Sequence, residues 1–199
     1  MSKEVVSYML SGMDNMKSLQ VQLILQCAPF LKGIKIACIL NITEENSREL
    51  YEILEGTGIE FKILTRNHGK CLVFLYRRES FSRYLKRTDV RGFLGSYGYE
   101  DVEPEKMLER LSKRVCQYSD GEICFPHEIG AFLDYPIDDV KCFIEKDGKD
   151  SLFSGYWKVY NNPGRAKMIF WAYDKAKTSA VNEYLIGKSI RDIAYAAAC

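Results

Sequence analysis

Long apolar runs are missing from this chain of 199 residues. Uninterrupted apolar stretches such as Cys71–Tyr76 are far shorter than the roughly 20 residues that a membrane-spanning helix requires. The N-terminal segment also lacks the apolar core of a signal peptide. We therefore expect a cytoplasmic protein with no membrane partner.

An excess of charge of either sign is missing as well. The formal net charge is +1, so no overall basic field attracts nucleic acid or an anionic membrane. Histidine is scarce, with 2 residues, and the 7 cysteines include no C-x-x-C pair, so the usual zinc and thioredoxin signatures are not present. The segment GFLGSYG is no phosphate loop, because it neither follows a predicted strand nor carries the required lysine. We expect no metal site, and we expect reduced thiols that pack as small apolar side chains.

What the sequence does contain is the pattern of an α/β (α+β) fold. Apolar residues at helical spacing run from Met13 to Cys27, and Pro29 is expected to end that helix. The segment GIKIACILNI predicts a buried strand, and β-rich runs on either side of Asn67-His68-Gly69 predict an antiparallel hairpin. The remainder is predicted to be mostly helical, apart from one strand in SGYWKVY. We expect a small mixed or antiparallel sheet of about four strands, flanked by helices and forming a single domain over residues 1–199.

A two-helix corner is predicted over residues 126–147, which begin PHEIGAFLDYPIDDVKCFIE. Apolar side chains recur at helical spacing on both sides of the turn Asp134-Tyr135-Pro136, as in a helix-turn-helix motif. The second helix, however, presents Asp138, Asp139 and Glu145 where a DNA-reading helix needs cations. We therefore expect the corner as a structural element and not as a site for duplex DNA.

His127 and Glu128 stand at the predicted start of the first corner helix. An H-E-x-x-H metal motif would need a second histidine where Ala131 stands, so that motif is incomplete. Pro126 and Glu128 suit the first turn of a helix on conformational and electrostatic grounds alone. His127 remains open to two interpretations: a structural or surface residue, or a group that contacts a ligand or transfers protons near neutral pH.

Further candidates come from one turn and two strands. Cys27 and Lys35 flank a tight turn in QCAPFLKGIK, and Arg77 ends the strongest predicted strand. Nearby ammonium groups lower a thiol pKa whereas the C-terminal end of a helix raises it, so Cys27 is either reactive or packed. Arg77 stands at the end of a strand, where α/β folds commonly bind anionic groups. The alternative is that Arg77 belongs to a solvated turn between the strand and the next helix. Trp157 and Tyr160 belong to a strand whose aromatic residues either stack on a flat ligand or pack in the core.

Four segments, QCAPFLKGIK, CLVFLYRRE, FPHEIGAFLDYPIDDVKCFIE and GYWKVY, occur in this order over most of the chain. Together they resemble a family of uncharacterised bacterial proteins, a domain-of-unknown-function family associated with anaerobic Gram-positive bacteria. FPHEIG followed by GYWKVY is the most specific part of the resemblance. It implies that Cys27, Arg77 and these two segments lie in recurrent parts of the family, and it implies no established activity. The family pattern has glycine at Asp134, but aspartate tolerates the left-handed conformation better than most residues.

These observations favour a protein that binds a small molecule or cofactor, and they do not decide whether it is an enzyme. We expect Cys27, Arg77 and His127 to meet in one pocket, with Arg77 as anion anchor. In that site His127 would give or take a proton, Glu128 would orient it, and Cys27 would be a nucleophile or soft contact. A regulatory module that holds a partner protein at the corner is one alternative, and a DNA-binding regulator is a second that the acidic helix disfavours. The catalytic candidates are His127, Glu128 and Cys27, and the ligand-binding candidates are Arg77, Lys35, Trp157 and Tyr160.

Overall fold

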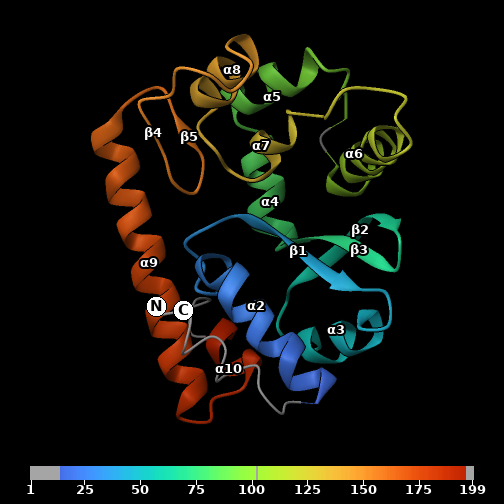
Figure 1. Ribbon diagram of the computed structural model, residues 1–199, viewed down its shortest axis with the longest axis vertical. Coiled ribbons are helices and arrows are strands. Elements are labelled where there is room, and N and C mark those ends of the chain that lie inside the picture. Colours follow the sequence, from blue (N-terminus) through green and yellow to red (C-terminus); the bar gives the residue numbers. More distant parts are fainter. Residues whose placement is uncertain (1–13, 102, 196–199) are drawn as a thin grey trace.

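The computed structural model describes residues 14–101 and 103–195, and a three-stranded antiparallel sheet lies at its centre (Figure 1). The strands are β1 (Ala37–Thr43), β2 (Glu60–Asn67) and β3 (Lys70–Tyr76). Their order is β1-β3-β2, so β3 is the central strand. Val73 of β3 accordingly lies opposite Leu40 of β1 and Ile63 of β2.

The β2–β3 hairpin turns where the sequence predicts it. His68 and Gly69 have φ angles of 49° and 72°. Two consecutive residues with positive φ are typical of the type I′ turn, whose twist matches that of the strands it joins. The prediction of an antiparallel hairpin at Asn67-His68-Gly69 is confirmed.

Alternate residues of the sheet face two separate cores, because side chains alternate along a strand. Cys38 and Leu40 face the first core, and Phe74 and Tyr76 face the second. Helices of the first core include α2 (Asn15–Leu31), α3 (Ser47–Leu54) and α10 (Ile190–Tyr195). Helices of the second core are α4 (Arg78–Leu85), α5 (Thr88–Gly95), α6 (Pro104–Ser119), α7 (Ile129–Phe132) and α8 (Ile137–Glu145).

A β-bulge in β2 fixes helix α6 on the sheet. The pairing of β2 with β3 shifts register between Ile63 and Thr65. The carbonyl of Leu64, at this irregularity, accepts hydrogen bonds from Ser112 Oγ (2.6 Å) and Cys116 Sγ (3.5 Å) of α6. The bulge therefore offers α6 a backbone acceptor that a regular ladder would use within the sheet.

Helix α9 (Pro163–Leu185) runs along one side of the molecule in Figure 1, beside α2 at one end and beside a short hairpin at the other. The hairpin consists of β4 (Phe153–Ser154) and β5 (Lys158–Val159). A Cβ atom on Gly155 would lie 2.1 Å from the ring of Phe170, so only glycine lets the hairpin pack this closely on α9.

The predicted α+β class with small antiparallel sheets is confirmed, with two differences in detail. The strand predicted in SGYWKVY is short and pairs with β4 in its own two-stranded sheet, so it does not extend the main sheet. Pro29 does not end α2, which continues to Leu31. A proline late in a helix forfeits a single backbone hydrogen bond, and burial of α2 against the sheet offsets this loss.

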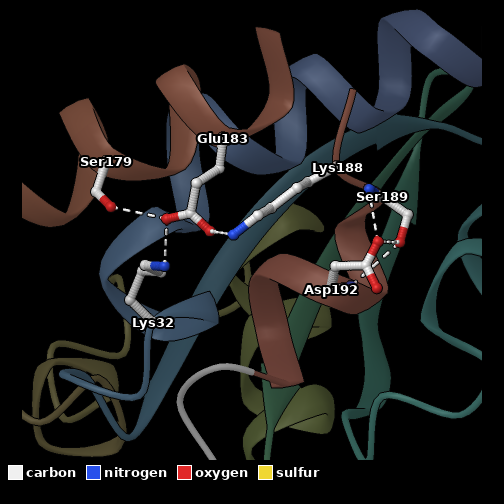
Figure 2. Close-up of polar contacts among 6 residues, drawn as sticks. All are labelled: Lys32, Ser179, Glu183, Lys188, Ser189 and Asp192. Carbon is white, nitrogen blue, oxygen red and sulfur yellow. Dashed lines mark hydrogen bonds and ion pairs between the residues drawn. The ribbon is translucent and has the colours of Figure 1, made fainter. Parts of the chain in front are cut away.

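Hydrogen bonds and ion pairs of Glu183 hold the C-terminal end of α9 in place (Figure 2). Glu183 accepts hydrogen bonds from Lys32 Nζ (2.6 Å), Ser179 Oγ (2.8 Å) and Lys188 Nζ (3.1 Å). The hydrogen bond from Lys32 is the main reason why the pKa of Glu183 falls to about 2. This network connects α9 to the end of α2, and Ser189 caps α10 through Asp192 close by.

Some sequence predictions concern residues outside the described ranges. The single domain expected over residues 1–199 includes 1–13, 102 and 196–199, and Cys199 lies in the last of these segments. The other six cysteines carry free thiols. Within 14–101 and 103–195, no helix is both long and apolar enough to cross a membrane.

Candidate functional site

The predicted two-helix corner is formed by α7, a turn through Asp134 and Tyr135, and α8. Asp134 adopts a left-handed conformation (φ 61°), as the sequence allows. A Cβ atom on Gly130 would lie 3.1 Å from Val140 Cγ2 and 3.3 Å from Tyr135 Cδ2. Glycine at this position therefore lets α7, the turn and α8 approach one another closely.

Asp139 joins the corner to the β4–β5 hairpin. Its carboxylate accepts hydrogen bonds from Trp157 Nε1 (2.8 Å), Tyr160 N (3.0 Å), Asn161 N (2.7 Å) and Asn161 Nδ2 (3.2 Å). Only 3% of Asp139 is exposed, so the expectation that it belongs to the acidic surface of this helix was wrong. A buried carboxylate is retained when hydrogen bonds replace its water, and here the hairpin supplies them.

A pocket of about 180 Å³ lies between the corner and the hairpin. We call it the aromatic pocket, because ring contacts connect much of its wall. The ring of His127 lies 5.2 Å from that of Phe125 and 5.1 Å from that of Phe143, and the rings of Tyr135 and Trp157 are 5.5 Å apart. The lining residues are Phe125, His127, Ile129, Gly130, Tyr135, Asp139, Val140, Phe143, Trp157 and Lys158.

His127 is half-buried in this wall. Its imidazole makes ring contacts but no hydrogen bond to any residue within the described ranges. Lys158 is the cation of the pocket: its Nζ donates to the Gly148 carbonyl (2.6 Å) and lies 5.7 Å from the centre of the Phe143 ring. The pocket thus combines apolar ring faces with one imidazole and one ammonium group.

Glu128 does not orient His127. It is fully buried, and its Oε1 accepts hydrogen bonds from Arg114 Nε and from Tyr99 OH (3.1 Å). Hydrogen bonding to Glu128 raises the pKa of Arg114, which stays charged. The pair connects α6 to the start of α7, so Glu128 holds the segment that carries His127 in place.

Arg77 and Lys35 line a different space, a cleft of about 580 Å³ that we call the cationic cleft. The guanidinium of Arg77 donates to the carbonyls of Phe30 (2.8 Å), Leu31 (3.2 Å) and Ala194 (3.4 Å). It therefore satisfies carbonyls at the C-terminal end of α2, which have no partner inside the helix. The lining residues are Gly33, Lys35, Ile36, Gly58, Arg77, Arg78, Glu79 and Ser80.

Lys35 is partly buried and forms no ion pair with any of the described residues. Burial lowers the pKa of its ammonium group. Its Nζ lies 5.0 Å from the centre of the Tyr135 ring, and no carboxylate of the described residues comes within ion-pair distance. Tyr135 is thus in contact with Lys35 on the cleft and with Trp157 on the aromatic pocket.

Cys27 is packed inside the first core with no exposed surface. Its Sγ lies 3.9 Å from the Ile39 carbonyl. Burial, followed by a hydrogen bond with Cys27, raises the pKa of the neighbouring Cys38 thiol. The packed interpretation of Cys27 describes this placement better than the reactive one.

The structure therefore divides the predicted site. His127 and Trp157 line the aromatic pocket, whereas Lys35 and Arg77 line the cationic cleft. Cys27 belongs to the first core, so the sheet lies between it and the second core, against which α7 packs. Tyr160 lies outside both spaces, with Lys146 Nζ 5.5 Å from its ring centre and its hydroxyl buried without a partner.

Sequence reasoning missed the residues that complete the aromatic pocket. From the sequence, Tyr135 is part of a turn and Phe143 is one apolar residue of the second corner helix. Asp139 bonds to residues 18 to 22 positions away, and no local pattern indicates such partners. The one signal available is the aromatic content of FPHEIG, LDYP and GYWKVY, which all contribute to this wall.

Comparison with known proteins gives one match. No curated protein and no solved structure matches the chain significantly. A family model described as "Protein of unknown function (DUF3793)" matches residues 23–194, which include the aromatic pocket and the cationic cleft. This range covers most of the chain, and the protein therefore belongs to the DUF3793 family of proteins of unknown function.

Proposed function

We propose that this protein binds a small ligand with a single aromatic ring in the aromatic pocket. One observation carries the proposal: the two segments with the most specific resemblance to a family, FPHEIG and GYWKVY, line the same pocket. Phe125 and His127 come from the first segment, and Trp157 and Lys158 from the second. These segments are about 30 residues apart in sequence, and the hydrogen bonds of Asp139 join the corner to the hairpin where they meet.

The size of the pocket sets the size of the ligand. An apolar protein cavity of about 150 Å³ is large enough to take up benzene. The aromatic pocket, at about 180 Å³, has room for one ring and little more. Its ring-lined walls favour a planar group, since aromatic pairs prefer edge-to-face or offset contacts with centroids roughly 4.5–7 Å apart.

The polar groups of the pocket favour an anionic substituent on that ring. Lys158 is exposed, and its ammonium group would attract a carboxylate at the pocket entrance. His127 would contact the ring or donate a hydrogen bond to the carboxylate. The ligand class that fits best is therefore a monocyclic aromatic acid.

Binding is supported better than catalysis. A proton-transferring histidine is usually oriented by a hydrogen-bonded partner. The neighbouring Glu128 is instead bonded to Arg114 and Tyr99. His127 therefore serves as a contact residue in this proposal, and no reaction is assigned to it.

The protein-interaction alternative has one observation in its favour. Phe125 is 40% exposed and Tyr118 44% exposed, and their rings are 5.1 Å apart beside the pocket. The single ring that enters the pocket would then be an aromatic side chain of a partner protein, with Phe125 and Tyr118 as surrounding contacts. The same pocket serves both functions, so the experiment must separate free ligands from peptides.

Tryptophan fluorescence tests the proposal directly, because the chain has 2 tryptophans in contrasting places. Trp157 lines the pocket, whereas Trp171 on α9 is 64% exposed. In Trp171→Phe, titration with benzoate or 4-hydroxybenzoate should change the emission of Trp157 saturably and raise the thermal midpoint. In Trp157→Phe, the emission of Trp171 should not respond.

A matched pair of histidine variants completes the test. His127→Asn should weaken binding about tenfold through loss of ring contacts, whereas His68→Asn, in the distant β2–β3 turn, should leave it unchanged. Absence of any response to aromatic acids, together with a response to aromatic peptides, would favour the interaction module. Absence of both would contradict the proposed function.

A further inference from the structure

A third cavity, of about 340 Å³, lies between the two-helix corner and the first half of α9. Its wall includes Asp134 and Tyr135 from the turn before α8, and Arg165 and Tyr173 from α9. Tyr135 and Trp157 belong to the walls of this cavity and of the aromatic pocket, so the two spaces are neighbours. We call it the mixed-charge cavity, because its wall carries both carboxylates and cations. Its volume is in the range of about 300–1,000 Å³ that is typical of small-molecule sites.

Tyr173 is buried in this wall with an unbonded hydroxyl group. Only 3% of the residue is exposed, and within 14–101 and 103–195 no group forms a hydrogen bond with its hydroxyl. The hydroxyl oxygen is not sealed inside the protein, so the accessible part of Tyr173 includes it and opens on the cavity. Tyr84 and Trp157, the other buried rings of the wall, donate to the Ala131 carbonyl (2.6 Å) and to Asp139 (2.8 Å). Of these three rings, Tyr173 keeps its hydrogen-bonding group for a ligand.

Asp134 supplies a carboxylate to the same wall. Its side chain is partly buried, and burial raises the pKa of its carboxyl group. The backbone N–H of Ile36 is its hydrogen-bond partner, and it forms no ion pair with a described residue. The cations that act on it from a greater distance are Arg87, Lys35 and Arg165. Burial, followed by the charge of Asp134, raises the pKa of the Tyr173 hydroxyl, which therefore stays protonated near this carboxylate. A carboxylate in this position favours a ligand that brings its own cation.

The unpaired charges of the wall are balanced in sign. Arg87 is neutralised by Asp89 (Nη2 to Oδ2, 2.7 Å). The other charged residues of the wall form no ion pair with a described residue, and they are Arg165, Lys141, Asp134 and Asp138. A ligand with a single charge meets repulsion as well as attraction in such a cavity, whereas a zwitterion matches both signs. The wall therefore favours a ligand with one ammonium group and one carboxylate.

We propose that the mixed-charge cavity binds a free α-amino acid with an apolar side chain. The ammonium group of the ligand pairs with Asp134, and its carboxylate accepts hydrogen bonds from Arg165 and from the Tyr173 hydroxyl. The side chain of the ligand packs on Ile169 and Trp157, which belong to the same wall. This site is a different space from the aromatic pocket and does not depend on the function proposed there.

Three compounds with the same side chain test the charge pattern on the unmodified protein. They are L-leucine, 3-methylbutylamine, which lacks the carboxylate, and 4-methylpentanoate, which lacks the ammonium group. L-Leucine at about tenfold its Kd should raise the thermal midpoint by about 4 °C. Each single-charge compound should bind at least tenfold more weakly, because it leaves one charge-assisted hydrogen bond unmade. Binding of the amine or the acid equal to that of L-leucine would overturn the proposal. So would the absence of a response to L-leucine, L-methionine and L-phenylalanine alike.

Two conservative variants place the ligand in this cavity. Tyr173→Phe removes a hydroxyl that has no partner among the described residues, so the midpoint of the free protein should stay within about 1 °C. It should weaken L-leucine binding about tenfold. Asp134→Asn keeps a residue that tolerates the left-handed conformation and should weaken binding at least tenfold. Tyr51→Phe, on the exposed surface of α3, should leave binding unchanged. Full L-leucine binding in either cavity variant would contradict the assignment.

Discussion

The aromatic pocket and the cationic cleft differ in how their polar groups are bonded. Around the pocket, the indole N–H of Trp157 and the backbone N–H groups of Tyr160 and Asn161 all donate hydrogen bonds to Asp139. In the cleft, Lys35 and the first N–H groups of α4 have no such acceptor. Satisfied polar groups leave apolar ring faces as the wall of the aromatic pocket, whereas the cleft keeps hydrogen-bond donors available.

Two lysines near the end of α2 show the same difference at the level of single residues. Lys32 forms an ion pair with Glu183 (2.6 Å) and is tied into the packing of α9. Lys35, three positions later, is also partly buried and forms no ion pair with a described residue. Lys32 therefore contributes to the packing of α9, whereas Lys35 contributes no such ion pair.

The largest expected effect comes from removing the satisfied carboxylate of the pocket. Asp139→Ala should destabilise the protein by about 3 kcal/mol, because it leaves buried donors of the hairpin unpaired. Asp138→Ala, next to it and exposed, should change stability by less than about 0.5 kcal/mol. Urea unfolding measures both. Equal effects of the two variants would mean that Asp139 does not hold the hairpin on the corner.

Removing the partner of Lys32 should have the next largest effect. Glu183→Gln should cost about 2 kcal/mol at neutral pH through weaker hydrogen bonds to Lys32 and Lys188. Because the pKa of Glu183 is lowered to about 2, its contribution is complete above about pH 4.5 and is lost as the pH falls towards 2. The difference between wild type and Glu183→Gln should therefore shrink in acid urea titrations. A constant difference down to pH 2 would refute this assignment.

Filling the space at Gly130 should have a smaller effect, about 1–2 kcal/mol of destabilisation for Gly130→Ala. The new Cβ would press on Val140 and Tyr135. Val140→Ala in the same chain should restore part of the loss, which a double-mutant cycle measures. If the effects of the two substitutions on the free energy of unfolding are simply additive, the contact between Gly130 and Val140 does not determine how closely α7 and α8 pack.

The smallest expected effect on the free energy of unfolding is a stabilisation. Lys35→Met should stabilise the protein by about 1 kcal/mol, because it removes a partly buried charge that has no ion-pair partner among the described residues. The pKa of Lys35 is lowered in the folded state, so unfolding takes up a proton, and wild-type stability should rise as the pH increases towards 10.5. The advantage of Lys35→Met over wild type should accordingly diminish at alkaline pH. Destabilisation by this variant in an anion-free buffer would show that Lys35 is structural.

Local patterns were sufficient for much of the fold. The Asn67-His68-Gly69 hairpin follows from a turn whose residues accept positive φ, and the corner follows from helical spacing on both sides of Asp134. Both signals lie within a few residues of the structure they predict. The length of the SGYWKVY strand was not predictable in the same way, because it depends on packing against Phe170 and Asp139.

The candidate site was only partly predictable for a related reason. His127, Trp157, Lys35 and Arg77 each line one of the two pockets, but the sequence does not state which core each helix covers. Cys27 and Arg77 seemed close to His127 because all lie at the ends of elements. The sheet has two faces, and α2 covers one while α7 packs into the core on the other. Assigning a helix to a face requires long-range contacts that no local spacing encodes.

The position of Tyr135 has a thermodynamic consequence for the aromatic pocket. Its ring lies under the Lys35 ammonium group and beside Trp157, so a ligand that moves this ring alters the surroundings of Lys35. Any such coupling must be reciprocal: if benzoate changes the pKa of Lys35, protonation of Lys35 changes the Kd for benzoate by the corresponding factor. One aromatic side chain would then make the occupancy of an apolar pocket depend on pH.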